Sequence, residues 1–295
     1  MDTFRQGVRV NNDLTRELLA EFFATGFLVL VGCGSMAQSI LSNGTVNAPI
    51  NVNLCWGFAI AFGIYIAQHI SGGHINPAVS TMFWSLGKLT SIRLLFYILA
   101  QTAGAFVGAA VVYMTYFDAL NKFDGGVRSI DGKNATVQIF IPFPSPYLTT
   151  FGGIIDGIVA TAIFCGSIAT IVDSRNKIPA PMQPLLIGFV VVMVGSSYGM
   201  NAGGTINPAR DLGPRIFTWC IGYGWKVFSF NNYTWFWIPI VAPLIGSLVG
   251  AWLYKLFIGF HWPKEGIRNL GNGRKRKEDD ILLTDRPREF SNIAS

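Results

Sequence analysis

The sequence has 295 residues, of which 51% are hydrophobic and only 13% are Asp, Glu, Lys or Arg. The charges gather at the two ends, since residues 264–295 hold 14 of the 38 charged side chains and residues 1–17 hold 6. The long stretch between them therefore carries far less charge than the surface of a soluble domain requires. This distribution excludes an ordinary soluble protein and predicts an integral membrane protein.

The net charge of +6 does not indicate nucleic-acid binding. Much of it comes from the basic run at 274–277, which has no aromatic side chains interleaved to stack on bases. The four cysteines show no CxxC spacing, so no disulfide framework or metal site is expected. No nucleotide-binding loop or catalytic motif is present, so we expect neither an enzyme nor a cofactor.

Six apolar segments are long enough to cross a membrane as helices, because a bilayer core about 30 Å thick needs roughly 20 residues. In chain order they are residues 18–41, 50–70, 91–117, 150–172, 181–199 and 235–258. Residues 18–263 are thus predicted to form one transmembrane domain. A cytoplasmic N-terminal segment, 1–17, precedes it, and a polar C-terminal tail, 264–295, follows it. The composition of the tail favours disorder.

Two further apolar segments, about 76–86 and 207–219, are too short to cross. Each begins with Asn-Pro, and asparagine is a good helix cap while proline is accepted at the first helical position. About ten residues that rise 1.5 Å each reach only halfway through a bilayer. The pattern predicts two half-helices that begin near the middle of the membrane. The alternative is that glycine and proline only kink ordinary spans.

The sequence also repeats itself. GGHINPAV at residues 72–79 and GGTINPAR at residues 203–210 match at six of eight positions. Each repeat, about 18–117 and about 150–258, contains three spans and one half-helix, and an odd number of spans turns the second copy upside down. The sequence therefore predicts an all-α membrane protein with six transmembrane helices and two re-entrant half-helices in an inverted repeat.

The flanking charges predict the orientation. Six spans put both termini on one side, and that side holds most of the Lys and Arg residues, so we expect both termini in the cytoplasm. The Asn-X-Ser/Thr triplets at Asn43, Asn134 and Asn232 fall on the opposite side. Asn43 and Asn134 are candidate glycosylation sites, whereas Asn232 lies close to the membrane.

The predicted meeting of two helix N-termini defines a chemical site. Such ends carry partial positive charge and free N–H groups, and the Asn76 and Asn207 amides add further donors. This site favours a neutral molecule that accepts hydrogen bonds and opposes a cation. The glycine-rich stretches before each Asn-Pro expose backbone carbonyls, which are tolerated at this depth only along a watery path.

The motifs SGGHINPAV and NAGGTINPARDLGPR resemble the paired motifs of the major intrinsic proteins, the aquaporin family, over about residues 15–260. Asp211, Arg215 and the pair Pro243 and Leu244 are similar to the pattern of the aquaglyceroporin branch. The resemblance implies an aquaporin-like fold and a homotetramer in which each subunit has its own pore. It also implies a location in the lipid of the plasma membrane.

Counted from these motifs, the resemblance places the selectivity filter of the family at Trp56, Gly195, Gly204 and Arg210. Water channels carry histidine where this chain has Gly195. An aromatic wall beside an arginine, with two glycines opposite, implies an opening that is wider and more apolar than water needs. The alternatives are that Arg210 is a structural ion pair and that Trp56 is an interfacial anchor.

Two further residues resemble supports of the re-entrant loops. Glu21 matches a buried carboxylate that accepts N–H groups, and His74 matches a histidine that braces its loop, with pH sensing as the alternative role. The position of Glu21 falls on Gly157 in the second repeat, with Asp156 beside it. Asp156 or a water replaces the missing carboxylate, or the alignment shifts by one residue.

Together the midplane site and the resemblance imply a passive, bidirectional channel. We expect it to pass glycerol, water and urea and to exclude ions and protons. One alternative is a secondary transporter, because inverted repeats with broken helices also occur there, but only Glu21 and Asp156 are acids within the six spans. The other alternative is a channel for water alone, which the glycines at 195 and 204 argue against.

Overall fold

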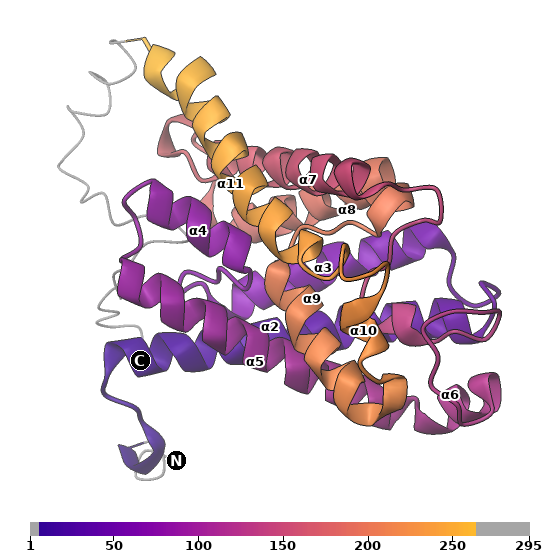
Figure 1. Ribbon diagram of the computed structural model, residues 1–295. Helices are drawn as coiled ribbons and strands as arrows, with labels where there is room; N and C mark the ends of the chain where they lie inside the picture. The colour runs from indigo at the N-terminus through magenta and orange to yellow at the C-terminus, as the bar shows by residue number, and fades with distance from the viewer. Residues whose placement is uncertain (1–5, 264–295) are drawn as a thin grey trace.

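The computed structural model describes residues 6–263, and within that range it contains helices and loops but no strand (Figure 1). Six of the described helices are long and apolar enough to cross a membrane, which confirms the six predicted spans. They are α2 (Asp13–Leu41), α3 (Pro49–Ala67), α5 (Ser91–Thr115), α7 (Thr150–Ile171), α8 (Gln183–Ala202) and α11 (Ile238–Phe257). The predictions for the tail, 264–295, lie outside the described residues.

The start of α2 differs from the predicted start at residue 18. The helix begins at Asp13 because Asn12 caps it, with the Asn12 Oδ1 accepting a hydrogen bond from the Thr15 backbone N–H at 3.0 Å. The sequence prediction followed hydrophobicity, and the first turns of this helix are polar. The helix thus extends beyond its apolar part.

The two half-helices are present and are short, as predicted. Helix α4 (Pro77–Ser85) has 9 residues and α9 (Pro208–Thr218) has 11. The Asn76 side chain caps α4 by accepting from the Ala78 N–H at 2.8 Å, and the Asn207 side chain caps α9 by accepting from the Ala209 N–H at 3.1 Å. Each Asn-Pro pair therefore begins a helix.

Shorter elements lie in the connections. They are α6 (Phe117–Asp124), α10 (Lys226–Ser229), the 3-10 turns η1 (Val137–Ile139), η2 (Ser174–Asn176), η3 (Ala180–Met182) and η5 (Gly259–His261), and the wide turn η4 (Trp219–Tyr223). Figure 1 shows α6 and α10 at the same end of the helix bundle, while α4 lies toward the end where α2 begins.

The packing of the helices follows the repeat. Helix α2 packs on α5 in the first repeat, and α7 packs on α11 in the second, while α3 and α8 join the two repeats. Each half-helix packs on the third span of the other repeat, α9 on α5 and α4 on α11. This exchange brings the starts of α4 and α9 together and confirms the inverted repeat.

Glycines allow the paired helices to approach closely. A Cβ atom at Gly104 of α5 would lie closer than 3.0 Å to the Phe22 carbonyl oxygen of α2. In the second repeat, a Cβ at Gly250 of α11 would lie equally close to the Ala162 carbonyl oxygen of α7. Within a membrane the hydrophobic effect does not hold helices together, so close van der Waals packing of this kind stabilises their association.

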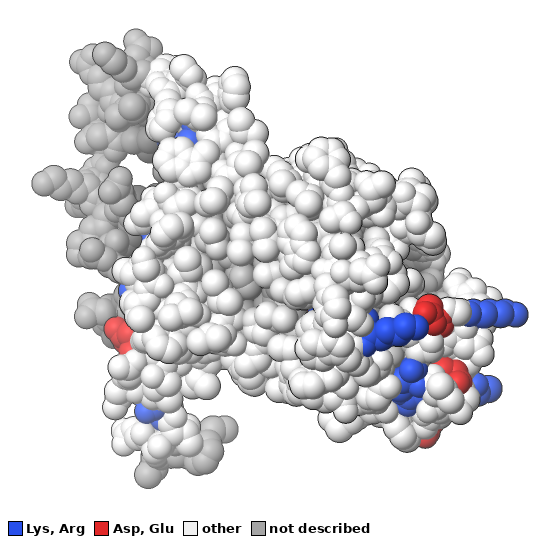
Figure 2. Space-filling model, viewed as in Figure 1, with Lys and Arg blue, Asp and Glu red and all other residues white. Residues whose placement is uncertain are grey.

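The surface of the described residues agrees with a multi-pass membrane protein. Large apolar side chains on the long helices are exposed, including Phe62, Phe151 and Phe257 at 55%, 72% and 71%. Figure 2 shows charged side chains toward the two ends of the molecule and a broad uncharged region between them. An apolar belt of this kind is stable only in lipid.

Candidate functional site

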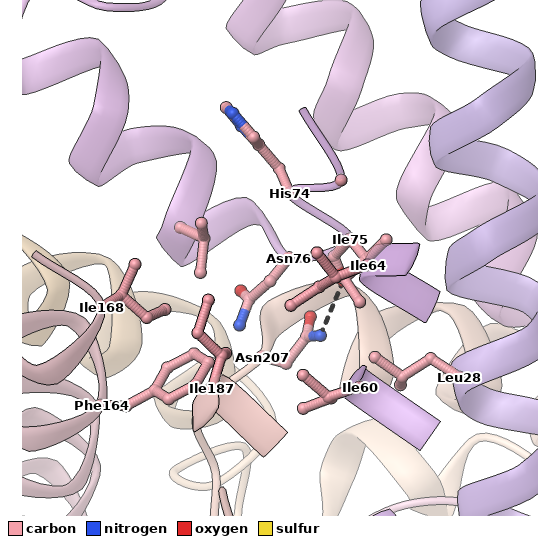
Figure 3. A pocket seen from close by; sticks show the side chains of 12 residues that line it. Leu28, Ile60, Ile64, His74, Ile75, Asn76, Phe164, Ile168, Ile187 and Asn207 are labelled. Carbon is pink, nitrogen blue, oxygen red and sulfur yellow. Dashed lines mark hydrogen bonds between the residues drawn. The ribbon is translucent and has the colours of Figure 1, made fainter. Parts of the chain in front are cut away.

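The Asn76 and Asn207 side chains meet where the two half-helices begin (Figure 3). The Asn76 Nδ2 donates a hydrogen bond to the Ile206 carbonyl at 2.9 Å, and the Asn207 Nδ2 donates to the Ile75 carbonyl at 3.0 Å. Each asparagine thus binds the residue that precedes the other. This reciprocal pair fixes both helix starts against each other at the centre of the bundle.

The same two amides keep hydrogen-bonding capacity. Each Oδ1 caps its own helix and one N–H of each Nδ2 is used across the repeat, so one N–H per amide remains. Both side chains line the same cavity. The rest of its lining is largely apolar, namely Leu28, Ile60, Ile64, Val79, Phe164, Ile168 and Ile187, with His74, Gly73 and Ile75.

Glu21 is hydrogen-bonded to the loop before α4. Its buried carboxylate accepts hydrogen bonds from the His74 N–H at 2.9 Å, the Ile75 N–H at 2.6 Å and the Ser71 hydroxyl at 2.6 Å. Ile75 has a positive φ of 45°, a left-handed conformation that a β-branched residue avoids. The Glu21 bonds hold Ile75 in this conformation, which turns its carbonyl toward Asn207.

His74 lies behind the same loop and is buried. Its Nδ1 is 3.1 Å from the Ser80 hydroxyl of α4, and its ring stacks on Phe83 with centroids 4.9 Å apart. Ser80 also accepts a hydrogen bond from the Gln101 amide at 3.1 Å. These contacts join His74 to α4, and its role as a brace of the loop stays a prediction.

The loop before α9 is held differently. A Cβ at Gly157 would lie 3.3 Å from the Thr205 hydroxyl oxygen and 2.9 Å from the Ala242 Cβ. Position 157 therefore faces this loop, as the alignment of Glu21 with Gly157 requires. Asp156 instead accepts from the Asn201 side chain at 2.8 Å, near the end of α8. Within the described residues, the buried Thr205 hydroxyl has no hydrogen-bond partner. The second loop therefore lacks the carboxylate support of the first.

Arg210 and Trp56 lie against each other. The Arg210 guanidinium carbon is 4.7 Å from the centroid of the Trp56 ring, and Arg210 is only 8% exposed. Its Nη1 donates to the Phe140 carbonyl at 2.9 Å. Cation–π contact of this kind fixes the plane of the guanidinium relative to the ring.

The two glycines of the predicted constriction differ. A Cβ at Gly204 would have no heavy atom within 4 Å, so this position borders open space. A Cβ at Gly195 would lie 2.7 Å from the Asn53 Oδ1. Asn53 is one helical turn before Trp56 on α3, and its Nδ2 donates to the Ser196 hydroxyl at 3.2 Å. The space beside Gly195 thus holds an amide from another helix.

Residues 9–254 match the sequence pattern of the family described as Major intrinsic protein. This chain belongs to the major intrinsic protein family. It is 43% identical to Aquaporin-9 of Homo sapiens over 263 residues, which cover 89% of each protein. It is also 43% identical to Aquaporin-10 of Milnesium tardigradum over 290 residues, which cover 93% of this chain and 71% of that protein.

The fold agrees with a solved member of the family. The X-ray structure of the aquaglyceroporin from Plasmodium falciparum superimposes with a TM-score of 0.75 and 30% identity, covering 83% of this chain and 97% of the other. These findings confirm the resemblance and the aquaporin-like fold predicted from the sequence.

In this major intrinsic protein the branch markers have structural partners. Asp211 and Arg215 form a fully buried ion pair with two hydrogen bonds of 2.7 Å each, and the Arg215 Nη1 donates to the Val227 carbonyl at 2.6 Å. Pro243 is buried inside α11, and the Leu244 carbonyl accepts from a serine hydroxyl at 2.8 Å. They support α9 and α11 rather than line the cavity.

Three site residues escaped the sequence analysis. The Phe140 carbonyl binds Arg210, a backbone role that leaves no trace in the identity of a side chain. Gly32 lies under Trp56, since a Cβ there would come closer than 3.0 Å to the indole ring. Asn53 had a usable signal, because residues three apart on a helix share a face and Trp56 was already assigned.

Proposed function

We propose that this chain is a passive, bidirectional channel for glycerol, water and urea. The observation that carries the proposal is the pair of crossed amides, Asn76 and Asn207, at the touching ends of two half-helices. They offer free N–H donors in an otherwise apolar cavity. A small neutral solute with hydroxyl or carbonyl acceptors can exchange its water for these donors without being held tightly.

The selectivity filter in this proposal is formed by Trp56, Gly195, Gly204 and Arg210. The carbon backbone of glycerol would lie on the indole while its hydroxyls bond Arg210 and nearby carbonyls. The open space beside Gly204 gives the extra width that a polyol needs. The Asn53 amide beside Gly195 adds a polar group to the wall.

Exclusion of ions and protons follows from the same geometry. A cation approaching the centre would meet two helix N-termini and the buried Arg210 charge, which all repel it. The crossed asparagines are held as donors by their own helix caps, so they orient a passing water as an acceptor. A water fixed in this way interrupts a proton-conducting chain.

The setting of the channel is proposed from the family resemblance and the surface. We place it as a homotetramer in the lipid of the plasma membrane, with both termini in the cytoplasm. Asn43 and Asn134 are exposed at loops, as glycosylation requires. Asn232 is also exposed but lies beside the exposed aromatic ring of Tyr233, in keeping with a position near the lipid surface.

Reconstitution into vesicles tests the function against its alternatives. Stopped-flow light scattering should show glycerol, urea and water permeabilities above those of empty vesicles, equal in both directions and independent of ion gradients. Uphill uptake coupled to an ion would instead establish a secondary transporter. Water flux without glycerol flux would establish a channel for water alone.

A further inference from the structure

A buried ion pair joins Asp124, the last residue of α6, to Arg128 in the loop that follows. Their side chains are 1% and 6% exposed, and the Arg128 Nη1 donates to both Asp124 carboxylate oxygens at 2.7 and 2.8 Å. Arg128 also donates from Nη2 to the Tyr113 hydroxyl at 3.1 Å and to the Asn121 Oδ1 at 2.7 Å. The pair is therefore fixed in position from several sides.

The ion pair continues into a chain of hydroxyl groups. The Thr136 hydroxyl donates to the Asp124 carboxylate at 3.2 Å and lies 2.7 Å from the Tyr223 hydroxyl. Thr136 is completely buried, and Tyr223, which ends η4 just after α9, is 5% exposed. We call Asp124, Arg128, Thr136 and Tyr223 the polar clamp. It links the segment 124–136 to Tyr223, which is distant in sequence.

The polar clamp leads directly to the partner of Arg210. From Thr136 the chain passes through η1, where the Ile139 N–H donates to the Thr136 carbonyl at 3.1 Å and the Phe140 N–H donates to the Val137 carbonyl at 3.0 Å. Val137, Ile139 and Phe140 are all 0% exposed. Phe140 therefore sits on a hydrogen-bonded turn whose first residue is held by the clamp.

We propose that the polar clamp is a positioning device that sets the selectivity of the channel by holding the Phe140 carbonyl against Arg210. This inference rests on the proposed function of Arg210 in the filter. A long arginine side chain has several rotatable bonds and needs a fixed acceptor to stay at the wall. The clamp fixes the acceptor from one side through Thr136, and through Tyr223 it holds the end of η4, the turn that follows the helix carrying Arg210.

The consequence for permeation depends on solute size. When the turn loosens, the guanidinium samples positions across the opening, which obstructs glycerol more than it obstructs water. A clamp that only stabilises the fold would lower the number of working channels and reduce both fluxes by the same factor. The ratio of glycerol to water permeability separates these roles, because the number of channels cancels from it.

The test uses Thr136→Val, which removes the hydroxyl and keeps the shape. The ratio of glycerol to water permeability should fall by about threefold or more, the effect expected from losing a buried hydrogen bond. Because this change also removes the triplet at Asn134, Asn134→Gln is the matched control and should keep the wild-type ratio. Thr136→Ser restores the hydroxyl and should restore the ratio.

Tyr223→Phe provides a second measurement if Thr136→Val does not fold. It removes only the hydroxyl that faces Thr136, and the ratio should again fall. A wild-type ratio in a folded Thr136→Val, or in Tyr223→Phe where the first variant does not fold, overturns the polar clamp alone. Absence of glycerol flux in wild-type vesicles overturns the proposed function and the clamp together, so the two failures are distinct.

Discussion

Replacing Gly32 with alanine tests the proposed filter from a helix that contributes no other group to it. Gly32 lies on α2, and a Cβ built there would come closer than 3.0 Å to three atoms of the Trp56 ring. Real Cβ atoms do not approach other atoms so closely, so the indole must move away from α2. Trp56 is also in contact with Arg210, so this displacement changes the geometry of the filter.

The size of the effect can be worked from these contacts. Carbon atoms rest at about 3.5–4.0 Å, so the indole has to retreat by roughly 1.5 Å. A retreat of this size into an opening that just admits glycerol should reduce glycerol permeability by about tenfold and water permeability by less than about threefold. The cost in stability should be about 1–3 kcal/mol, as for other overpacked sites.

The assay is stopped-flow light scattering on vesicles with equal amounts of folded protein, measured by size-exclusion chromatography. Gly34→Ala is the matched control, because Gly34 lies on the same helix and a Cβ there meets nothing within 4 Å. It should leave both permeabilities unchanged. If Gly32→Ala conducts glycerol and water in the wild-type ratio, Trp56 does not line the narrowest point, and the reasoning is refuted.

Three further substitutions test other parts of the molecule. Gly195→His should suppress glycerol flux more than water flux, because the new side chain enters the opening. It also displaces the Asn53 amide, whose oxygen would lie only 2.7 Å from the new Cβ. Equal loss of both fluxes in vesicles would contradict the proposed filter. Asn207→Ala should impair conduction or folding, since it leaves the Ile75 carbonyl and two N–H groups at the start of α9 unpaired. An unchanged flux would show that the site at the crossed asparagines is not needed for conduction. Burial of the Asp173 carboxyl raises its pKa, but hydrogen bonds from Arg175 outweigh this and lower the pKa to about 2. Because the folded value lies below the ordinary value of about 3.9, the stabilisation is complete above roughly pH 5 and is lost as the pH falls toward 2. Asp173→Asn should therefore lower the free energy of unfolding by about 1–2 kcal/mol at pH 7, and the difference from wild type should vanish near pH 2. The measurement is denaturation of the detergent-solubilised protein at both pH values. A difference that stays the same at pH 2 would be evidence against a stabilising ion pair between Asp173 and Arg175.

Much of the fold could be predicted from the sequence because the membrane imposes simple rules. A span must be about 20 apolar residues long, and every backbone group within it must be paired, so six spans and two half-length segments could be counted directly. The repeated Asn-Pro motif and the odd number of spans per copy then required that the two half-helices meet. The crossed bonds of Asn76 and Asn207 are the result.

The site was predictable only where side-chain identity carries the chemistry. Glu21 and His74 could be singled out in this way, since a buried carboxylate must find donors wherever the chain places it, and their roles as loop supports stay predictions. The Gly157 position could not be settled, because a glycine has no side chain whose requirements reveal its surroundings. In the structure, the position of the missing Gly157 side chain faces Thr205.

The sequence by itself determined the number of spans, the two half-helices, their inverted relation and the residues brought to the centre. Only the tertiary structure decided what contacts Arg210, namely the Phe140 carbonyl and the Trp56 ring that lies over Gly32. The physical reason is that hydrophobic length and helix capping are local properties written in neighbouring residues. A backbone carbonyl is the same at every position, so its choice of partner depends on where the folded chain places it.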